Sequence, residues 1–200
     1  NNSFIDISSK NSEIKSSNQP LEYIHVKNIS ELKKIVEEIK IKGLVAIDTE
    51  TNSLNLEKAI LVGISLSYNE NKSFYIPINH KDPASNKQIK EQIEEDKVLN
   101  QIKLICSDPS IMKIGQNLKY DIRLLKKYNV KFVSFDDTML LSYVLDNGLT
   151  RHGMDELAYR LLNHITTKYK DLVGSGKKEI TFDYVPIKEA TKYAAEDALI

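Results

Sequence analysis

The chain is organised around the stretch Leu44-Val45-Ala46-Ile47-Asp48-Thr49-Glu50-Thr51. Its apolar first half follows Gly43 and predicts a central strand that is buried on both faces and ends in acids. Because side chains alternate along a strand, Asp48 and Glu50 point to one side and Thr49 points to the other. Folds of the α/β class place their ligand sites at the carboxyl ends of strands, so we expect a site here.

Two carboxylates at one strand end need a counter-charge. Like charges about 4 Å apart repel by roughly 4 kcal/mol at an effective dielectric constant near 20. A hard divalent cation removes that cost, and ligation by oxygen alone favours Mg²⁺ or Mn²⁺ over Zn²⁺. An isolated Asp-x-Glu pair is also typical of solvated strand ends and helix caps, so further acids must distinguish the two interpretations.

Composition indicates a soluble globular protein with a single domain. The 200 residues are 41% hydrophobic, and no apolar run approaches the roughly 18 residues of a transmembrane helix. The 28 basic and 28 acidic residues cancel, so any binding of nucleic acid must come from a local site. The single cysteine, Cys106, excludes an internal disulfide and fits a reducing compartment. Residues 1–20 are rich in Asn, Ser and Lys and predict a linker or disordered terminus, followed by one domain at 21–200.

Periodicity predicts three antiparallel strands followed by strand–helix units. The expected strands lie at residues 23–26, 44–51, 60–67, 74–76, 111–114 and 132–135. The expected helices lie after an N-cap at Ser30, within 86–106 with a break near 94–96, from 116 to 128, after a cap at Asp136 or Asp137, from 154 to 161, and from 187 onward. Pro77 suggests that the strand at 74–76 is an edge strand, and residues 163–186 predict a long polar loop.

Other chemical groups fall near the ends of the predicted elements. Asp121 follows the strand at 111–114 and lies at the start of a helix, near a carboxyl end of the sheet. Tyr193 and Asp197 are four residues apart on the last predicted helix and therefore share one face. Glu196 points elsewhere on that helix, and we expect it to be exposed.

Three motifs carry a family resemblance. They are Asp48-Thr49-Glu50-Thr51-Asn52-Ser53-Leu54, Gly115-Gln116-Asn117-Leu118-Lys119-Tyr120-Asp121 and Tyr193-Ala194-Ala195-Glu196-Asp197. Together they resemble the 3′–5′ proofreading exonuclease domain of bacterial, family A, DNA polymerase I, a DEDD-type exonuclease of the tyrosine subclass. The resemblance implies an α/β fold with a ribonuclease H-like mixed sheet of five or six strands flanked by helices. It also implies that the chain is an excerpt of a longer polymerase, truncated at its C-terminal end.

The resemblance implies a catalytic role for five residues. Asp48, Glu50 and Asp197 would hold one metal ion, and Asp48 and Asp121 would hold a second. Tyr193 would orient the attacking water, since a phenol with an unperturbed pKa near 10 is a poor general base at neutral pH. The chemistry independently favours four acids, because hydrolysis of a phosphodiester uses two metal ions roughly 3.5–4 Å apart.

The resemblance also implies a set of substrate contacts. Leu54 would wedge against the terminal base, and Tyr169 would stack on a base. Gln116 and Asn117 would bind the strand backbone. The full set implied is Thr49, Leu54, Gln116, Asn117, Tyr120, Arg151 and Tyr169.

Our first hypothesis is an exonuclease that uses two divalent ions, Mg²⁺ or Mn²⁺, to release nucleoside 5′-monophosphates from single-stranded DNA 3′ ends. Its partners would be the DNA end and the polymerase domain of the parent chain, with no membrane, and the isolated domain would be a monomer. The expected location is cytoplasmic, in the bacterial cytosol or at the nucleoid, although an organelle-type compartment also fits. Two alternatives stay open, namely a catalytically silent structural or strand-binding module and a ribonuclease D-like exonuclease that trims RNA.

Overall fold

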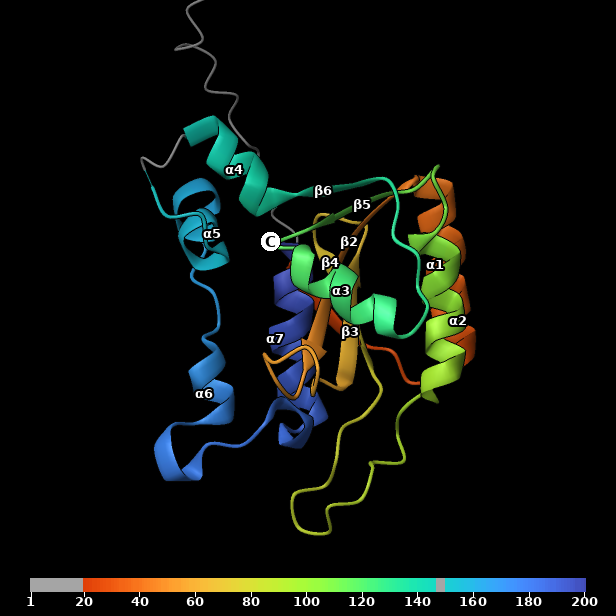
Figure 1. Ribbon diagram of the computed structural model, residues 1–200, viewed down its shortest axis with the longest axis vertical. Coiled ribbons are helices and arrows are strands. Elements are labelled where there is room, and N and C mark those ends of the chain that lie inside the picture. The colour runs from red at the N-terminus through yellow and green to blue at the C-terminus, as the bar shows by residue number, and fades with distance from the viewer. Residues whose placement is uncertain (1–19, 147–149) are drawn as a thin grey trace, which may run out of the picture.

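A mixed six-stranded sheet forms the centre of the molecule (Figure 1). The computed structural model describes residues 20–146 and 150–200, so residues 1–19 of the linker predicted at 1–20 lie outside the described residues. The strand order is β1-β4-β3-β2-β5-β6. The strands are β1 (Glu22–His25), β2 (Leu44–Thr51), β3 (Leu61–Ser67), β4 (Lys72–Pro77), β5 (Met112–Gly115) and β6 (Phe135–Asp137). The structure therefore confirms the predicted mixed α/β sheet.

Strand β2 pairs with an antiparallel strand on one side and with a parallel strand on the other. It pairs with β3 in antiparallel orientation, and β3 pairs likewise with β4. On its other side β2 runs parallel to β5, and β5 runs parallel to β6. The pairing with β3 continues to Thr51, whereas the pairing with β5 ends at Ala46. The acidic end of β2 is thus paired with a neighbouring strand on one side only.

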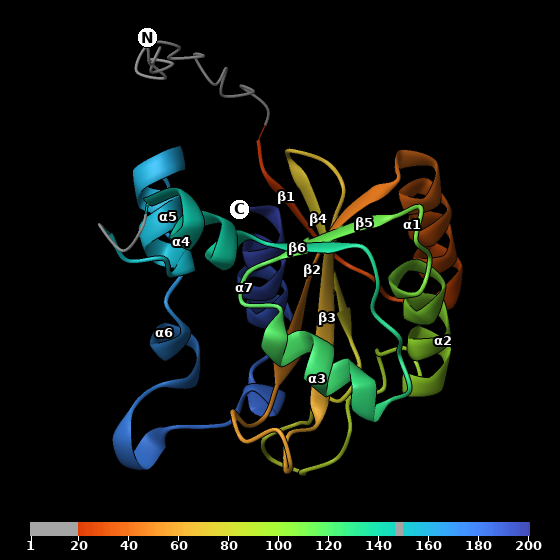
Figure 2. The ribbon, with the colours of Figure 1, turned by 45° about the horizontal axis from the view of Figure 1, so that its top comes forward.

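Helices cover both faces of the sheet. They are α1 (Ile29–Lys42), α2 (Glu95–Cys106), α3 (Lys119–Lys127), α4 (Thr138–Asp146), α5 (Met154–Leu162), α6 (Tyr169–Val173) and α7 (Ile187–Leu199). Figure 2 shows α1 and α2 together on one side of the sheet and α7 on the other. Leucine and isoleucine side chains of α1, α2 and α3 form one core with Val45 and Ile47 of β2. Alanines of α7 pack against Val62 and Tyr75 on the opposite face, and their small size brings this helix close to the strands.

Two local predictions about the first half of the chain are wrong. Helix α1 is capped by Asn28 and not by Ser30. The Asn28 Oδ1 atom accepts the Glu31 N–H at 3.0 Å, and the Glu31 carboxylate accepts in return from Asn28 Nδ2 at 2.7 Å and from the Lys27 N–H at 2.9 Å, an arrangement similar to a capping box. Strand β4 is not an edge strand, because β1 pairs with its residues Lys72 to Tyr75. Pro77 is tolerated because it lies beyond that paired segment.

Three further boundaries differ from the prediction. Only residues 95–106 of the segment 86–106 are helical, because Gln92 and its neighbours instead hydrogen-bond with His80. The strand expected at 132–135 is β6 at 135–137, and it extends directly to the capping residue of α4. The predicted loop at 163–186 contains α6 and two 3₁₀ turns, Gly176–Lys178 and Phe182–Tyr184.

Helices α4 and α5 expose an unusual amount of apolar surface. Val144 is 76% exposed and Leu145 is 82% exposed, and no residue of α4 is buried. Leu161 and Tyr159 of α5 are also exposed. Both views show these two helices beside one another and away from the sheet. Neither they nor any other helix of the described residues combines the length and the apolar character needed to cross a lipid bilayer.

Candidate active site

Three carboxylates from distant parts of the chain meet at the acidic end of β2. One oxygen each from Asp48, Glu50 and Asp197 lies within 4.8 Å of the other two. Asp48 and Glu50 are brought together by the alternation of side chains along β2, as predicted. Asp197 reaches them from α7, whose alanines bring the helix against the sheet. These three groups supply hard oxygen donors in an arrangement that can hold a divalent metal ion.

Asp121 lines one cleft together with these three acids, and Thr49 holds its carboxylate in place. Its Oδ1 atom accepts the Thr49 backbone N–H at 3.1 Å and also accepts the Thr49 hydroxyl. This contact exists because β5 separates from β2 before Thr49, which leaves the Thr49 N–H without a partner in the sheet. Asp121, in the first turn of α3, fills that position. Thr49 faces away from the acid pair, as its place in the strand predicts.

The acids destabilise one another in the folded protein. Burial, followed by repulsion from the neighbouring carboxylates, raises the pKa of Asp48 and the pKa of Glu50 well above their usual values. Burial raises the pKa of Asp121 to about 6, although hydrogen bonds from Thr49 act in the opposite direction. Burial likewise raises the pKa of Asp197 to about 7, against the hydrogen bond from Tyr193. Across residues 20–146 and 150–200 no lysine or arginine forms an ion pair with these acids.

Tyr193 belongs to an aromatic cluster beside the acids. Its ring lies 6.1 Å from the Tyr169 ring and 6.0 Å from the Phe182 ring, measured between centroids. Tyr169 and Phe182 are stacked, with an interplanar angle of 10°. Burial and the charge of Asp197 raise the pKa of Tyr193 far above its usual value, so its hydroxyl stays protonated at neutral pH. Sequence reasoning did not assign a site role to Phe182, which is fully buried behind the two tyrosines.

The acids line a cleft of about 560 Å³. Every predicted site residue except Arg151 lines it. Leu54 lies in the loop after β2 and is 91% exposed. The Tyr120 hydroxyl donates to the Ser53 carbonyl oxygen at 2.7 Å and so ties α3 to the same loop. Arg151 is exposed and lies outside this set of lining residues.

The amides of the second motif differ in how they are held. The Gln116 Nε2 atom donates to the His152 carbonyl oxygen at 2.7 Å, while Gln116 Oε1 accepts from the Thr138 hydroxyl. Asn117 adopts a left-handed backbone with φ of 58°, and its side chain is exposed. Gln116 is therefore fixed in one orientation, and Asn117 projects toward solvent at the edge of the cleft.

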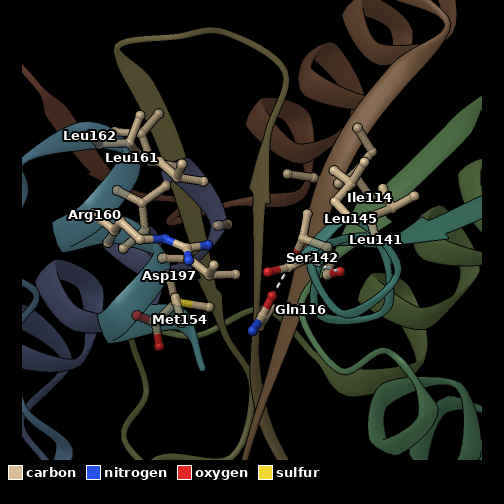
Figure 3. Close-up of a pocket in the computed structure, with 18 of the residues that line it drawn as sticks. Ile114, Gln116, Leu141, Ser142, Leu145, Met154, Arg160, Leu161, Leu162 and Asp197 are labelled. Atoms are coloured by element: carbon tan, nitrogen blue, oxygen red, sulfur yellow. Dashed lines mark hydrogen bonds between the residues drawn. The ribbon is translucent and has the colours of Figure 1, made fainter. Parts of the chain in front are cut away.

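A second, more apolar cleft of about 630 Å³ meets the first one. Gln116 and Asp197 line both clefts, and leucines of α4 and α5 form the walls of the second (Figure 3). Arg160 also lines it and binds Asp146 across it at 2.6 Å. The strongly apolar walls give this cleft little capacity to bind a charged backbone by itself.

The prediction that Glu196 is exposed is wrong. Its carboxylate is buried and accepts the Thr167 N–H at 2.7 Å. It also pairs with His164 Nε2 at 3.0 Å. These contacts tie the segment before α6 to α7, close to Asp197. The signal available in the sequence was the run of small residues around Glu196, which indicates a closely packed helix face.

A model of the 3′–5′ exonuclease family matches residues 23–200. The chain belongs to this 3′–5′ exonuclease family. Among curated proteins, DNA polymerase I of Rhizobium leguminosarum is 43% identical over 189 residues, which cover 88% of the chain and 19% of the relative. DNA polymerase I of Pseudomonas aeruginosa is 42% identical over 159 residues, which cover 78% of the chain and 17% of the relative. The exonuclease chain spans about a fifth of the length of these relatives.

Solved structures support the fold. Brucella melitensis NrnC superposes with a TM-score of 0.59 at 22% identity, covering 90% of the exonuclease chain and 74% of NrnC. Escherichia coli RNase D gives a TM-score of 0.64 at 18% identity, with 88% and 41% of the two chains covered. Together with the family match, these structures confirm the predicted ribonuclease H-like arrangement and the predicted resemblance to the exonuclease domain of bacterial DNA polymerase I.

Proposed function

We propose that the acid cleft removes nucleotides from the 3′ end of single-stranded DNA and releases nucleoside 5′-monophosphates, as the proofreading module of a DNA polymerase I. The observation that carries this proposal is the convergence of Asp48, Glu50 and Asp197 within 4.8 Å without a compensating basic side chain among the described residues. Membership of the 3′–5′ exonuclease family supports the polarity of the reaction.

Two divalent ions, Mg²⁺ or Mn²⁺, would bind the acids. Asp48, Glu50 and Asp197 would hold the first, and Asp48 with Asp121 would hold the second. The hard oxygen donors and the raised pKa values of these groups both fit a cationic ligand. A structure of Brucella melitensis NrnC with bound Mg²⁺ is consistent with this assignment. When bound, the ions would supply a hydroxide nucleophile and stabilise the leaving oxygen.

The remaining residues would bind and orient the substrate. The Tyr193 hydroxyl, which stays protonated, would hydrogen-bond the attacking water one helical turn from Asp197. Tyr169 would stack on a base with Phe182 behind it, and stacking accepts every base. Leu54 would press against the terminal base from its exposed loop. These three contacts would hold the terminal nucleotide against the acids.

Polar groups would bind the strand backbone. The exposed Asn117 amide and the fixed Gln116 amide face the cleft, and Tyr120 would line the pocket for the terminal nucleotide. Thr49 would hold Asp121 in place, in addition to any contact that it makes with the DNA strand. Arg151 would reach a phosphate only from beyond the cleft, because it is exposed and does not line it.

The relatives support a proposal about the wider setting. Their length supports a parent chain in which a polymerase domain follows or surrounds this module, acting in the bacterial cytoplasm. The strand partner would be a single-stranded DNA 3′ end, and the isolated exonuclease chain would be a monomer. A structure of Brucella melitensis NrnC bound to pGG is consistent with an acid cleft that accepts a nucleic acid end.

A degradation assay tests the proposal. With Mg²⁺ or Mn²⁺ the protein should shorten a single-stranded DNA that carries an internal label, and a chelator should stop the reaction. Asp48→Ala and Asp121→Ala should abolish it. Asp108→Ala should not, since Asp108 only caps a turn through Ser110, at the opposite end of β5. Wild-type protein that behaves like the Asp48 and Asp121 variants would disprove the function and favour the silent module.

An RNA substrate addresses the remaining alternative. The structural likeness to Escherichia coli RNase D supports an RNA-trimming activity only weakly, because at 18% identity it concerns the fold alone. We expect the DNA strand to be degraded faster than an RNA of the same base sequence. The reverse order would favour the ribonuclease D-like function.

A further inference from the structure

Asp137 is a buried acid close to the cleft that has no part in the acid cluster. Its carboxylate accepts four backbone N–H groups. Oδ1 accepts from Asn117 at 3.0 Å, from Met139 at 2.9 Å and from Leu140 at 3.4 Å. Oδ2 accepts from Leu118 at 2.9 Å. Both oxygens are therefore occupied by N–H donors, and the group is not free to act as a metal ligand.

These four donors belong to two helix N-termini. Helix α4 begins directly after Asp137, which caps it in the ordinary way. Helix α3 begins after Leu118, whose side chain has no acceptor, so the first N–H groups of that region need a partner from elsewhere. Asp137 supplies it from β6, and its negative charge lies favourably at both helix N-termini.

The segment that Asp137 holds leads into the acid cleft. Asn117 lines the cleft, and its left-handed backbone turns the chain from β5 into α3. Asp121 lies in the first turn of α3, so the place of that carboxylate depends on where the helix begins. The first residue of α4 adds a further contact, because the Thr138 hydroxyl donates to the Gly115 carbonyl oxygen at 3.2 Å and to Gln116 Oε1.

We propose that Asp137 is a positioning residue of the exonuclease site, which sets the places of Asn117 and Asp121 without touching metal or DNA. The inference rests on the proposed function. Loss of the carboxylate frees the Asn117 and Leu118 N–H groups, allows the start of α3 to shift, and moves Asp121 relative to Asp48. The consequence is weaker metal binding and slower cleavage in a protein that stays folded.

The variant Asp137→Ser separates the contacts that Asp137 makes with the start of α3 from those that it makes with the start of α4. Serine is a good N-cap for α4, but its shorter side chain does not reach Asn117 and Leu118. In the metal-free variant we expect amide exchange at Asn117 and Leu118 to be at least roughly tenfold faster, while Met139 stays protected. The midpoint of a Mn²⁺ titration followed by electron paramagnetic resonance should rise by about tenfold or more, and kcat should fall by a similar factor at saturating metal and DNA.

Two further variants complete the experiment. Asp137→Asn keeps the shape but has a single acceptor oxygen, which can serve the Asn117 and Met139 N–H groups while the amide nitrogen faces the Leu118 N–H. If Asp137→Ser fails to fold, this variant should speed amide exchange at Leu118, weaken Mn²⁺ binding and lower kcat, in the same direction. Asp108→Asn is the matched control at the other end of β5 and should leave all three readouts unchanged. A folded Asp137 variant with wild-type Mn²⁺ binding and kcat would overturn the proposal, as would unchanged exchange at Asn117 and Leu118. If wild-type protein cleaves no DNA, amide exchange and Mn²⁺ binding still decide the role of Asp137.

Discussion

Replacing Glu50 by glutamine measures how strongly the carboxylates repel one another. The change keeps the shape of the side chain and removes one charge from three groups whose oxygens lie within 4.8 Å. One pair of full charges at this separation repels by about 3 kcal/mol at an effective dielectric constant near 20. Proton uptake by the acids already relieves part of this repulsion, so we expect a gain in unfolding free energy of about 2 kcal/mol at pH 8 in a chelator. In a domain of this size that gain raises Tm by roughly 4–8 °C.

The gain should depend on pH in a defined direction. Each acid has a folded pKa above its unfolded value, so the native state binds more protons than the unfolded state between the two values. The contribution of these acids to the stability of the metal-free protein is therefore largest near pH 4, and it is lost as the pH rises through the folded pKa of Asp121, about 6, and that of Asp197, about 7. At pH 5 the wild-type acids are largely protonated, and the advantage of Glu50→Gln should shrink.

Melting curves followed by circular dichroism provide the assay, at pH 5 and pH 8, in chelator and with Mg²⁺. Excess Mg²⁺ should stabilise wild-type protein by mass action and the variant far less, which reverses their order. Glu70→Gln, at the exposed hairpin after β3, is the control and should change Tm little in any condition. A Glu50→Gln protein that is less stable than wild type at pH 8 in chelator, or equally stabilised by Mg²⁺, would refute the repulsion.

Two substitutions test the geometry around the acids. Gly115→Ala would place Cβ 2.5 Å from Leu118 Cδ2 and 2.8 Å from the Ile47 carbonyl oxygen, so we expect a loss of about 1–3 kcal/mol in a urea titration, and an unchanged midpoint would contradict the contact. Tyr193→Phe keeps the ring contacts and removes only the hydroxyl, so cleavage should slow by roughly tenfold or more while binding of a labelled single strand is retained. An equal loss of binding would show that the hydroxyl serves the strand and not the water.

Much of the site could be predicted because the spacing of its residues follows the periods of local strands and helices. An apolar run that ends in acids predicted β2, and the two-residue period of a strand predicted that Asp48 and Glu50 lie on one side of it. The helical period put Tyr193 and Asp197 on one face. The three motifs, taken together in their order along the chain, added the prediction that distant elements meet at one site. No local pattern contains that information.

The wrong predictions concern contacts between distant segments or choices between similar residues. Ser30 and Asn28 are both good caps, and only the reciprocal bonds of Glu31 favour Asn28. The burial of Glu196 depends on the segment at 164–167 folding back onto α7. The bond from Thr49 to Asp121 depends on where β5 leaves β2, which is a property of the assembled sheet.

The water-facing leucines and valine of α4 and α5 affect how unfolding can be observed. Dyes that fluoresce in apolar surroundings bind exposed apolar patches, so they should bind this protein before it is heated. The high starting signal would flatten or invert a melting transition. The chain has ten tyrosines and no tryptophan, and several of the tyrosines lie in or beside the cleft, so intrinsic tyrosine emission reports unfolding without an added probe.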